Sequence, residues 1–448
     1  MTTCSVETTR SLPPAVAIAA LGASSFMITL DATALHVALP TIAEELGAGL
    51  SALQWITNAY TLVFAGLLLS SGALSDRLGA RRVFLAALLF FLGASTLCGL
   101  APSTEVLIAA RAIQGIGAAA ILPSSMALLV HAFPNPKDRA YALGTWSAIS
   151  AVALVAGPLL GGFLAGTLGW RAIFLLNLPV GLLAYIAASM SVGNPDQQRR
   201  AFDPLGQTFG MLALIALVFA ATEGQELGWM SFPVLATAVV GVVAVAAFVI
   251  IERRHVDPML PFQIFRSRAF TGAIMAAFLY NFAYYGALFS LSIILQADGA
   301  APVSVGLKFA PMTATTAIVA YAIGRMVAKF GAPLPGMITL SIGAVGAALM
   351  VFGGFTSTIF LLGSLLIGIG GATLPAIVAT ALENVPSARA GVGSAVLNTA
   401  RQAGGAFGVA VLGTLIATAS PSVALATISA SFLLGAIAMK VSLNPAVK

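Results

Sequence analysis

The chain has 448 residues, of which 59% are hydrophobic and only 8% are charged, and its mean hydropathy is +1.00. One water-soluble globule has too little interior to hide so much apolar surface, so a soluble fold is excluded. The net charge of +6 follows from basic residues placed in loops between apolar runs, which argues against nucleic-acid binding. The two cysteines, Cys4 and Cys98, exclude a disulfide framework.

Long apolar runs divide the sequence. A bilayer-spanning helix needs about 20 mainly apolar residues, and loop signals separate fourteen such runs. The apolar runs lack the alternation of apolar and polar residues that marks the strands of an outer-membrane barrel. We therefore predict an all-α polytopic membrane protein. The first run follows Arg10 in the manner of a signal peptide, but its length and the internal Asp31 indicate a retained helix. The predicted spans lie near residues 15–39, 53–74, 83–101, 106–133, 141–168, 171–190, 205–222, 233–251, 270–295, 305–328, 335–354, 359–382, 394–418 and 423–439.

Basic residues are distributed unevenly over the predicted loops. With the amino terminus inside, nearly all loop Lys and Arg face the cytoplasm, and Arg171 is the exception in an outer loop. The sequence therefore predicts a multi-pass protein of the cell (inner) membrane with both termini cytoplasmic. The outer loops are expected to hold Glu44, Glu45, Glu105, Glu223, Glu226 and Asp298.

Two short patterns recur late in the chain. Segment 324–332 repeats the spacing of the glycines and of a basic residue in segment 72–80, and Gly368-Ile369-Gly370 repeats Gly115-Ile116-Gly117 at nearly the same offset. Matching offsets in equivalent spans predict two pseudo-twofold related halves of six helices with an extra helix pair between them, a 6+2+6 arrangement. The predicted units are residues 1–190, residues 191–266 with the extra pair and cytoplasmic links, and residues 267–448.

A charged, glycine-punctuated segment joins the second and third spans. Charge is scarce in this chain, so an acid and several arginines between two apolar runs indicate a surface loop held by ion pairs. A loop of this kind is expected to act as a joint or latch. The conformational latch is assigned to Gly72, Asp76, Arg77, Gly79, Arg81 and Arg82.

One acid and one base lie deep inside predicted spans. A charge at that depth is costly unless it is paired or faces a wet cavity. Asp31 lies about 13 Å inside the outer end of the first helix and Arg111 about 9 Å inside that of the fourth, so a direct or water-bridged approach is expected. A carboxylate beside a movable cation can serve as a proton switch, whereas a permanently ionised pair would only fix the two helices. Gln114 lies on the same helix face as Arg111 and could share the site.

The second half is expected to contribute polar and aromatic groups, because it lacks charged counterparts of Asp31 and Arg111. Its spans hold no interior Asp or Glu, which favours neutral, weakly acidic or monocationic solutes over dications. His36 is predicted to be a hydrogen-bonded structural residue, with proton transfer as the alternative. For the aromatic residues, interhelical packing is the alternative to lining a cavity. The substrate cavity is assigned to Gln114, Asn58, Tyr60, Asn281, Tyr284 and Tyr285.

Several motifs, in order along the chain, resemble one family. Ser75-Asp76-Arg77-Leu78-Gly79 resembles the loop signature of the major facilitator superfamily, although Ala80 stands where a basic residue is common. Arg111-Ala112-Ile113-Gln114-Gly115 and Gly157-Pro158-Leu159-Leu160-Gly161-Gly162 resemble helix signatures of its fourteen-helix drug:proton antiporters, and the pattern is most similar to that of methylenomycin A resistance exporters.

The resemblance implies a monomeric exporter of small hydrophobic or amphiphilic drugs or antibiotics in the lipid bilayer, driven by the proton gradient without a metal or cofactor, and not an enzyme. In this family the fifth helix meets the other half and seals one side of the pathway. The resemblance therefore assigns a gating role to Gly157, Pro158, Gly161 and Gly162.

Two other functions are weighed against drug export. A facilitative or proton-coupled metabolite transporter would use the same fold, and transport that ignores a pH gradient would indicate the facilitative form. A non-transporting membrane sensor or enzyme is disfavoured, because the sequence has no His/Glu metal spacing, phosphate-binding loop or soluble domain.

Overall fold

The computed structural model describes residues 14–193, 203–255, 258–353, 357–386 and 389–443. All regular structure in these ranges is helical, which confirms the predicted all-α class. A bilayer offers no water to backbone N–H and C=O groups, and a helix satisfies them within one segment. The helices are α1 (Pro14–Leu46), α2 (Leu50–Leu78), α3 (Ala80–Gly99), α4 (Thr104–Ala132), α5 (Pro136–Thr167), α6 (Arg171–Leu175), α7 (Asn177–Ser191), α8 (Pro204–Glu223), α9 (Phe232–Arg254), the 3₁₀ turn η1 (Phe262–Arg266), α10 (Arg268–Ala297), α11 (Pro302–Phe330), α12 (Pro333–Gly353), α13 (Ser357–Gly371), α14 (Leu374–Glu383), α15 (Ala390–Thr418) and α16 (Pro421–Val441).

Thirteen helical segments of the described chain are long and apolar enough to cross a membrane. The pairs α6–α7 and α13–α14 each form one of these segments. A fourteenth is α2, whose parts Leu50–Leu68 and Ser70–Leu78 meet at 56°. Length and composition thus confirm the predicted fourteen spans, and the chain is a multi-pass membrane protein. Cys4, Arg10 and residues 194–202 and 256–257 of the predicted middle unit lie outside the described residues.

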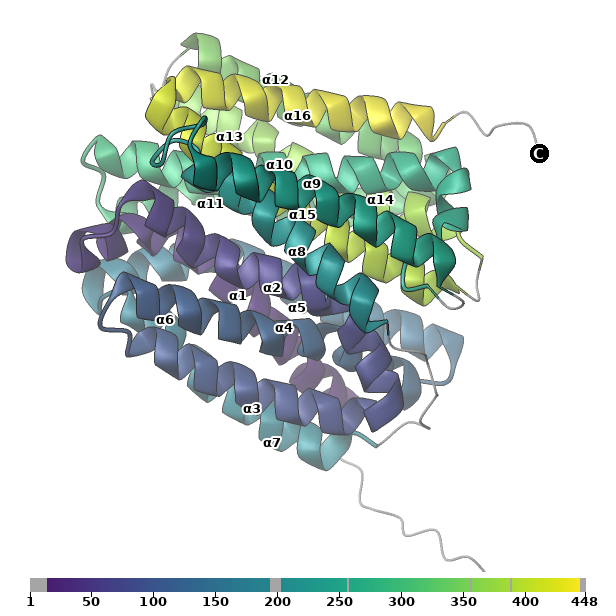
Figure 1. Ribbon diagram of the computed structural model, residues 1–448. Helices are drawn as coiled ribbons and strands as arrows, with labels where there is room; N and C mark the ends of the chain where they lie inside the picture. The colour runs from purple at the N-terminus through teal and green to yellow at the C-terminus, as the bar shows by residue number, and fades with distance from the viewer. Residues whose placement is uncertain (1–13, 194–202, 256–257, 354–356, 387–388, 444–448) are drawn as a thin grey trace, which may run out of the picture.

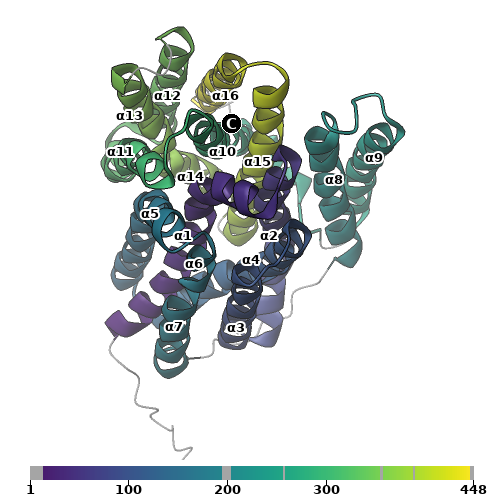
Figure 2. The same cartoon turned by 90° about the vertical axis from the view of Figure 1, so that its left-hand side faces the viewer.

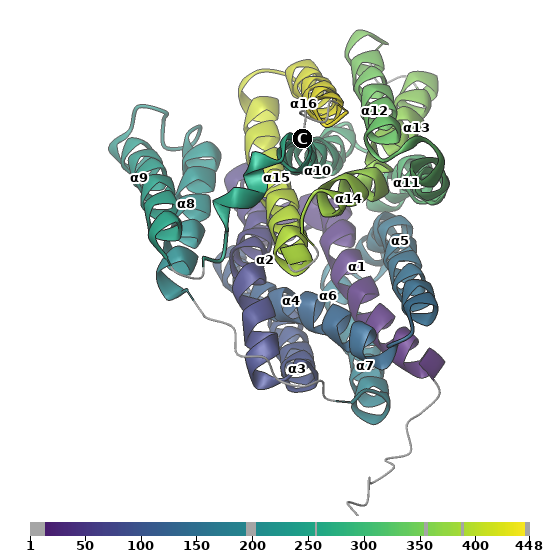
Figure 3. The same ribbon diagram turned by 90° about the vertical axis from the view of Figure 1, so that its right-hand side faces the viewer.

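The long helices run side by side in one bundle (Figure 1). Turned views show α1–α7, here called the N-terminal half, beside α10–α16, the C-terminal half, with α8 and α9 set apart at the edge (Figures 2 and 3). Each half has its own apolar core, which buries Phe84 and Phe91 in the first and Phe309 and Phe432 in the second. The extra pair attaches through α8, which packs on α2 and α15.

The predicted loop over residues 72–82 is wrong, because most of this segment is helical. α2 continues to Leu78, α3 begins at Ala80, and Gly79 alone separates them, with a φ of +92°. Glycine adopts this φ without a steric penalty, so one residue makes the turn and the charged side chains project from helix ends. We call this side of the bundle the Arg81 end, and the opposite side, where α1 turns into α2, the Glu45 end.

The repeated glycines make matching contacts in the two halves. A Cβ on Gly115 of α4 would lie 2.6 Å from the carbonyl oxygen of Tyr60 in α2, and one on Gly368 of α13 would lie 2.3 Å from that of Met312 in α11. At both positions the absent side chain lets two helix backbones approach closely. The matching contacts support the internal repeat predicted from the sequence.

Candidate functional site

Asp31 and Arg111 form a buried ion pair inside the N-terminal half. Nη1 of Arg111, on α4, lies 2.5 Å from Oδ2 of Asp31, on α1. Their side chains are 1% and 0% exposed, respectively. The predicted approach of the two residues is confirmed, and it is direct rather than water-bridged.

Two amides complete the shell around the Asp31 carboxylate. Nε2 of Gln114 donates to Oδ1 at 3.0 Å, and Nδ2 of Asn177 donates to the same oxygen at 2.8 Å. Oε1 of Gln114 also accepts a bond from Nη1 of Arg111 at 2.7 Å. The carboxylate therefore meets three N–H donors, a set that complements its ionised form. We refer to Asp31, Arg111, Gln114, Asn177 and Ser95, which supports the two amides, as the Asp31 network.

Ser95 and Asn177 were absent from the predicted site. Oγ of Ser95 accepts from Nδ2 of Asn177 at 2.9 Å and from Nε2 of Gln114 at 3.3 Å, and it donates to the carbonyl oxygen of Phe174 at 2.9 Å. Asn177 begins α7 directly after the break that separates α6 from α7. An amide at such a break, two residues before Pro179 in an apolar span, was a usable signal. Ser95 has no feature in the sequence that separates it from other serines in spans.

α2 supports the cation from the other side. Nε of Arg111 donates to the carbonyl oxygen of Ile56 at 3.2 Å, and the guanidinium carbon lies 4.3 Å from the centre of the Tyr60 ring. The cation–π contact adds to the ion pair, and the close contact of Gly115 with α2 brings Arg111 within reach. Asp31 is fully covered in this conformation.

Three of the predicted cavity residues join helices in this conformation instead of lining open space. Gln114 belongs to the Asp31 network, and Tyr60 stacks on Arg111. Tyr284 is fully buried, and its hydroxyl lies 3.2 Å from Oγ1 of Thr316 in α11. Gln114 and Tyr284 thereby use hydrogen-bonding capacity that the prediction reserved for a solute, whereas the buried hydroxyl of Tyr60 has no hydrogen-bond partner in the described part of the chain.

The other three predicted cavity residues, like Tyr60, keep polar atoms without a hydrogen-bond partner. Both side-chain polar atoms of Asn58, and Oδ1 of Asn281, are buried without a hydrogen-bond partner in the described part of the chain. Tyr285 is part-exposed. Buried polar groups are normally paired, so these side chains retain the capacity to bind a polar solute.

His36 differs from its prediction as a hydrogen-bonded residue. Its Nδ1 is buried and has no partner among the described residues. The ring instead lies 6.2 Å from the Tyr285 ring and 6.4 Å from the Phe289 ring, between centroids. The neighbours of the imidazole are thus aromatic rings of α10. The bond at this residue is made by its backbone carbonyl, which accepts from Ser292 at 2.6 Å.

A second cation lies at membrane depth in the C-terminal half. Arg401 sits well inside α15, so this half holds a charged group at that depth besides the polar and aromatic groups that the prediction named. The signal was present, because Arg401 falls inside the predicted span 394–418. Its Nη1 donates to Oδ1 of Asn398 at 3.0 Å, whereas its Nε is buried without a hydrogen-bond partner in the described chain.

The predicted gating residues fit α5 closely against two helices. They are Gly157, Pro158, Gly161 and Gly162. A Cβ on Gly161 would lie 2.5 Å from the carbonyl oxygen of Ala34 in α1, a contact inside the N-terminal half. A Cβ on Gly162 would lie 2.6 Å from the carbonyl oxygen of Pro302 in α11, a contact between halves near the Glu45 end.

Hydrogen bonds also join the halves toward the Glu45 end. Nε2 of Gln54 in α2 donates to the carbonyl oxygen of Ala410 in α15 at 2.8 Å. Nε2 of Gln296 in α10 donates to that of Val37 in α1 at 2.9 Å. Together with the contact between α5 and α11, these bonds close the bundle at the Glu45 end.

The predicted latch residues lie at the Arg81 end, at the junction of α2 and α3. Arg77 and Arg82 are exposed, and Asp76 is part-buried. Nη2 of Arg81 donates to the carbonyl oxygen of Ser189 at 2.6 Å, which ties α3 to α7 within the N-terminal half. Gly79 makes the turn, whereas open space surrounds the position of a Cβ on Gly72.

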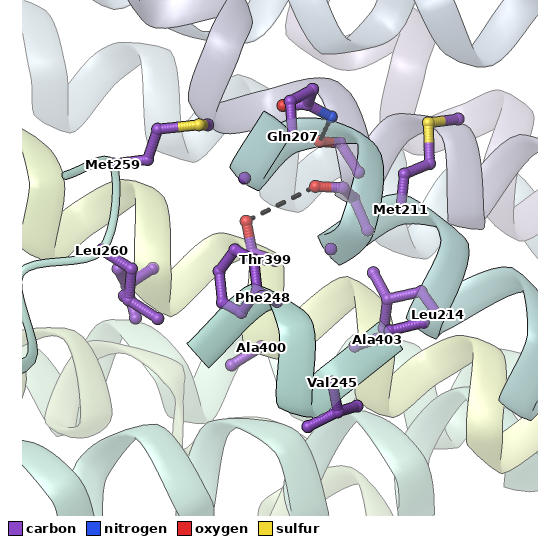
Figure 4. A pocket seen from close by; sticks show the side chains of 16 residues that line it. Gln207, Met211, Leu214, Val245, Phe248, Met259, Leu260, Thr399, Ala400 and Ala403 are labelled. Carbon is purple, nitrogen blue, oxygen red and sulfur yellow. Dashed lines mark hydrogen bonds between the residues drawn. The ribbon is translucent and has the colours of Figure 1, made fainter. Parts of the chain in front are cut away.

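An apolar pocket lies between the extra pair and the two halves (Figure 4). Its volume is about 270 Å³, and its walls include Met211 of α8, Phe248 of α9 and Ala403 of α15. Gln207 crosses from α8 to α2, where its Nε2 donates to the carbonyl oxygen of Gly66. The lining contains no residue of the Asp31 network, so the pocket is a separate feature.

Fourteen spans in two packed halves, with charged and polar side chains buried at membrane depth, define an α-helical membrane transporter. The family model of the Major Facilitator Superfamily matches residues 21–409, and the chain belongs to this superfamily. Membership places the protein among transporters and not among enzymes.

Similar proteins extend over most of the chain. The methylenomycin A resistance protein of Streptomyces coelicolor is 37% identical over 418 residues, which cover 92% of this chain and 87% of that protein. The multidrug resistance protein Stp of Mycobacterium tuberculosis is 38% identical over 402 residues, 89% of this chain and 75% of that protein. A solved POT family transporter in complex with 5-aminolevulinic acid has a TM-score of 0.70 at 15% sequence identity. The match covers 95% of this chain and 94% of that chain. At this identity the similarity shows the fold alone.

Proposed function

We propose that this protein is a proton-coupled antiporter that exports small hydrophobic or amphiphilic drugs by alternating access. The names of its relatives, which refer to methylenomycin A resistance and multidrug resistance, support drug export. The proton gradient supplies the energy, with no cofactor. The cargo is neutral, weakly acidic or singly cationic, because Asp31 is already paired with Arg111 and offers little charge to a dication.

The observation that carries the coupling proposal is the fully covered Asp31 carboxylate with Arg111 at 2.5 Å. Protonation of Asp31 removes the charge that holds Arg111, and separation of the helices removes the donors that favour the ionised form. Proton occupancy and helix packing are therefore linked. A linked pair of this kind drives an exchanger when each proton state favours a different conformation.

Alternating access requires the two halves to move as units. We assign residues 1–190 and 267–448 to these units and residues 191–266 to the links and extra pair, in a monomer of the cell membrane with its Arg81 end and both termini in the cytoplasm. The described conformation is closed at the Glu45 end, through contacts such as Gln54 with Ala410. The latch residues act in the opposite conformation, when the Arg81 end closes.

The coupling is tested with Asp31→Asn in everted membrane vesicles. Uptake of a panel of antibiotics and dyes is measured with and without an imposed pH gradient, together with substrate-dependent proton release. Asn resembles the protonated acid and cannot cycle, so gradient-driven transport should fall to the level of vesicles that lack the protein. Asp298→Asn changes an exposed acid at the end of α10 and serves as the matched control.

Near-normal gradient-driven transport by Asp31→Asn would remove this residue from the coupling role. Wild-type transport that ignores the gradient would instead indicate a facilitator.

The latch is tested separately with Asp76→Ala. Cysteines are placed along the pathway, and their labelling by a reagent added from the cytoplasmic side should rise in this variant. Unchanged labelling in a stably expressed variant would reduce the segment to a topology signal.

A further inference from the structure

Arg401 is a membrane-depth cation without an acidic partner. Its described hydrogen bond runs from Nη1 to Oδ1 of Asn398, one turn earlier on the same helix, at 3.0 Å. Its Nε is buried without a partner, and it forms no ion pair with any acid in the described ranges. The residue as a whole is part-exposed.

Tyr285 of the facing helix, α10, lies against α15 one turn beyond Arg401. A Cβ on Gly405 would be in ordinary van der Waals contact with the Tyr285 side chain, at 3.8 Å. The neighbouring Gly404 lets the two helix backbones approach closely, because a Cβ there would clash with the carbonyl oxygen of Phe278 in α10. No hydrogen bond engages the Tyr285 hydroxyl in the described structure. Asn281, one turn before Tyr285, also has an unpartnered Oδ1.

The bond from Nη1 to Asn398 leaves the edge formed by Nε and Nη2 free. Two parallel N–H groups on one edge of a guanidinium match the two oxygens of a carboxylate, which makes such a pair strong and geometrically specific. We infer that Arg401 binds the carboxylate of an exported amphiphilic organic acid, with the hydroxyl of Tyr285 as a further donor. The assignment of this acid as cargo rests on the proposed function.

The charges of the other half favour the same class of solute. Asp31 neutralises Arg111 within a closed shell, so neither residue presents a net charge to the pathway. Arg401 is then the uncompensated interior charge of the described spans, and it attracts anions. A bound carboxylate would remove the penalty of an unpaired charge at membrane depth. The aromatic side chains of α10 provide an apolar surface for the body of the same molecule.

Dansylglycine and its methyl ester provide a matched pair of probes, because they differ in whether the carboxyl group is ionised. Binding of each to the purified full-length protein is measured by dansyl fluorescence, in phosphatidylcholine nanodiscs without a pH gradient. The wild type should bind the acid more tightly than the ester. Arg401→Gln should lower the acid-to-ester affinity ratio about tenfold, the amount expected for one charge-assisted bond. Arg401→Lys should lower it less, since charge remains but the two-pronged geometry is lost.

Arg325→Gln is the matched control, because Arg325 is an exposed cation near the Arg81 end of α11. Its acid-to-ester ratio should equal that of the wild type, and Arg401→Gln should unfold at the wild-type temperature. A wild-type ratio of one, or a ratio that Arg401→Gln leaves unchanged, overturns the inference. Loss of acid binding in phosphatidylglycerol nanodiscs would assign the site to a lipid headgroup and also overturn it. Since no gradient is applied, acid selectivity that depends on Arg401 stands even if proton-driven export fails.

Discussion

Two arginines at membrane depth have opposite surroundings. Arg111 in the N-terminal half contacts a carboxylate, a glutamine, a backbone carbonyl and a tyrosine ring. Arg401 in the C-terminal half has one amide partner from its own helix and a buried Nε without any. A cation whose donors are satisfied by other helices holds those helices together. A cation with free donors is available to a ligand. The two proposals therefore divide the roles, with Arg111 in the coupling pair and Arg401 in the binding of a carboxylate.

The largest difference should appear when each cation is removed. Arg111→Leu leaves the Asp31 carboxylate buried without its counter-charge and should cost about 3–5 kcal/mol of folding free energy. Arg401→Leu removes a charge that has no acidic partner and should leave stability unchanged or raised. Thermal unfolding of both variants in detergent measures the contrast. Equal unfolding temperatures for the two variants would contradict the division of roles.

The supporting amides offer a second comparison. Asn177→Ala removes one donor from Asp31 and one from Ser95, so we expect a loss of about 1–3 kcal/mol. Asn281→Ala removes an amide whose described bond goes to Ala277 of its own helix, so its cost should be smaller. The same thermal assay compares them, and a greater loss for Asn281→Ala would show that its amide has a structural partner in another state.

Two adjacent glycines of α5 make different contacts. Gly161 packs against α1 within the N-terminal half, and Gly162 packs against α11 of the other half. An added methyl group in a closely packed contact costs about 1–3 kcal/mol. Gly161→Ala should destabilise every conformation, because α1 belongs to the same half. Gly162→Ala should selectively disfavour closure of the Glu45 end and raise labelling of pathway cysteines from that side. Similar labelling of the two variants would argue against a gating role for Gly162.

The smallest effect is expected for the ion pair at the Glu45 end. Glu45 contacts Arg171 and accepts a hydrogen bond from Nε1 of Trp170 at 2.7 Å. The side chains of Glu45 and Arg171 are 47% and 35% exposed, so solvent screens the pair. Glu45→Gln keeps an acceptor for Trp170 and should lower stability by about 1 kcal/mol or less. A loss as large as that of Arg111→Leu would show that burial does not explain the contrast between these pairs.

The sequence by itself determined the spans and the pairing of Asp31 with Arg111. Both follow from local quantities, namely the length of apolar runs, the rise of a helix per residue and the cost of a charge in a bilayer. The repeated glycines also followed from spacing alone. The same depth argument applies to Arg401, which lies within the predicted span 394–418, so the sequence also determines this buried charge.

The tertiary structure decided which faces meet and therefore which polar groups are satisfied. Asn177 and Ser95 become part of the Asp31 shell only because α3 and α7 converge on α1 and α4. The aromatic neighbours of His36 come from α10, in the other half. The free edge of Arg401 is likewise a property of packing, since no local pattern states which side chains of a distant helix will face it. Hydrogen bonds between helices depend on positions set by the whole bundle, and a span read in isolation does not contain them.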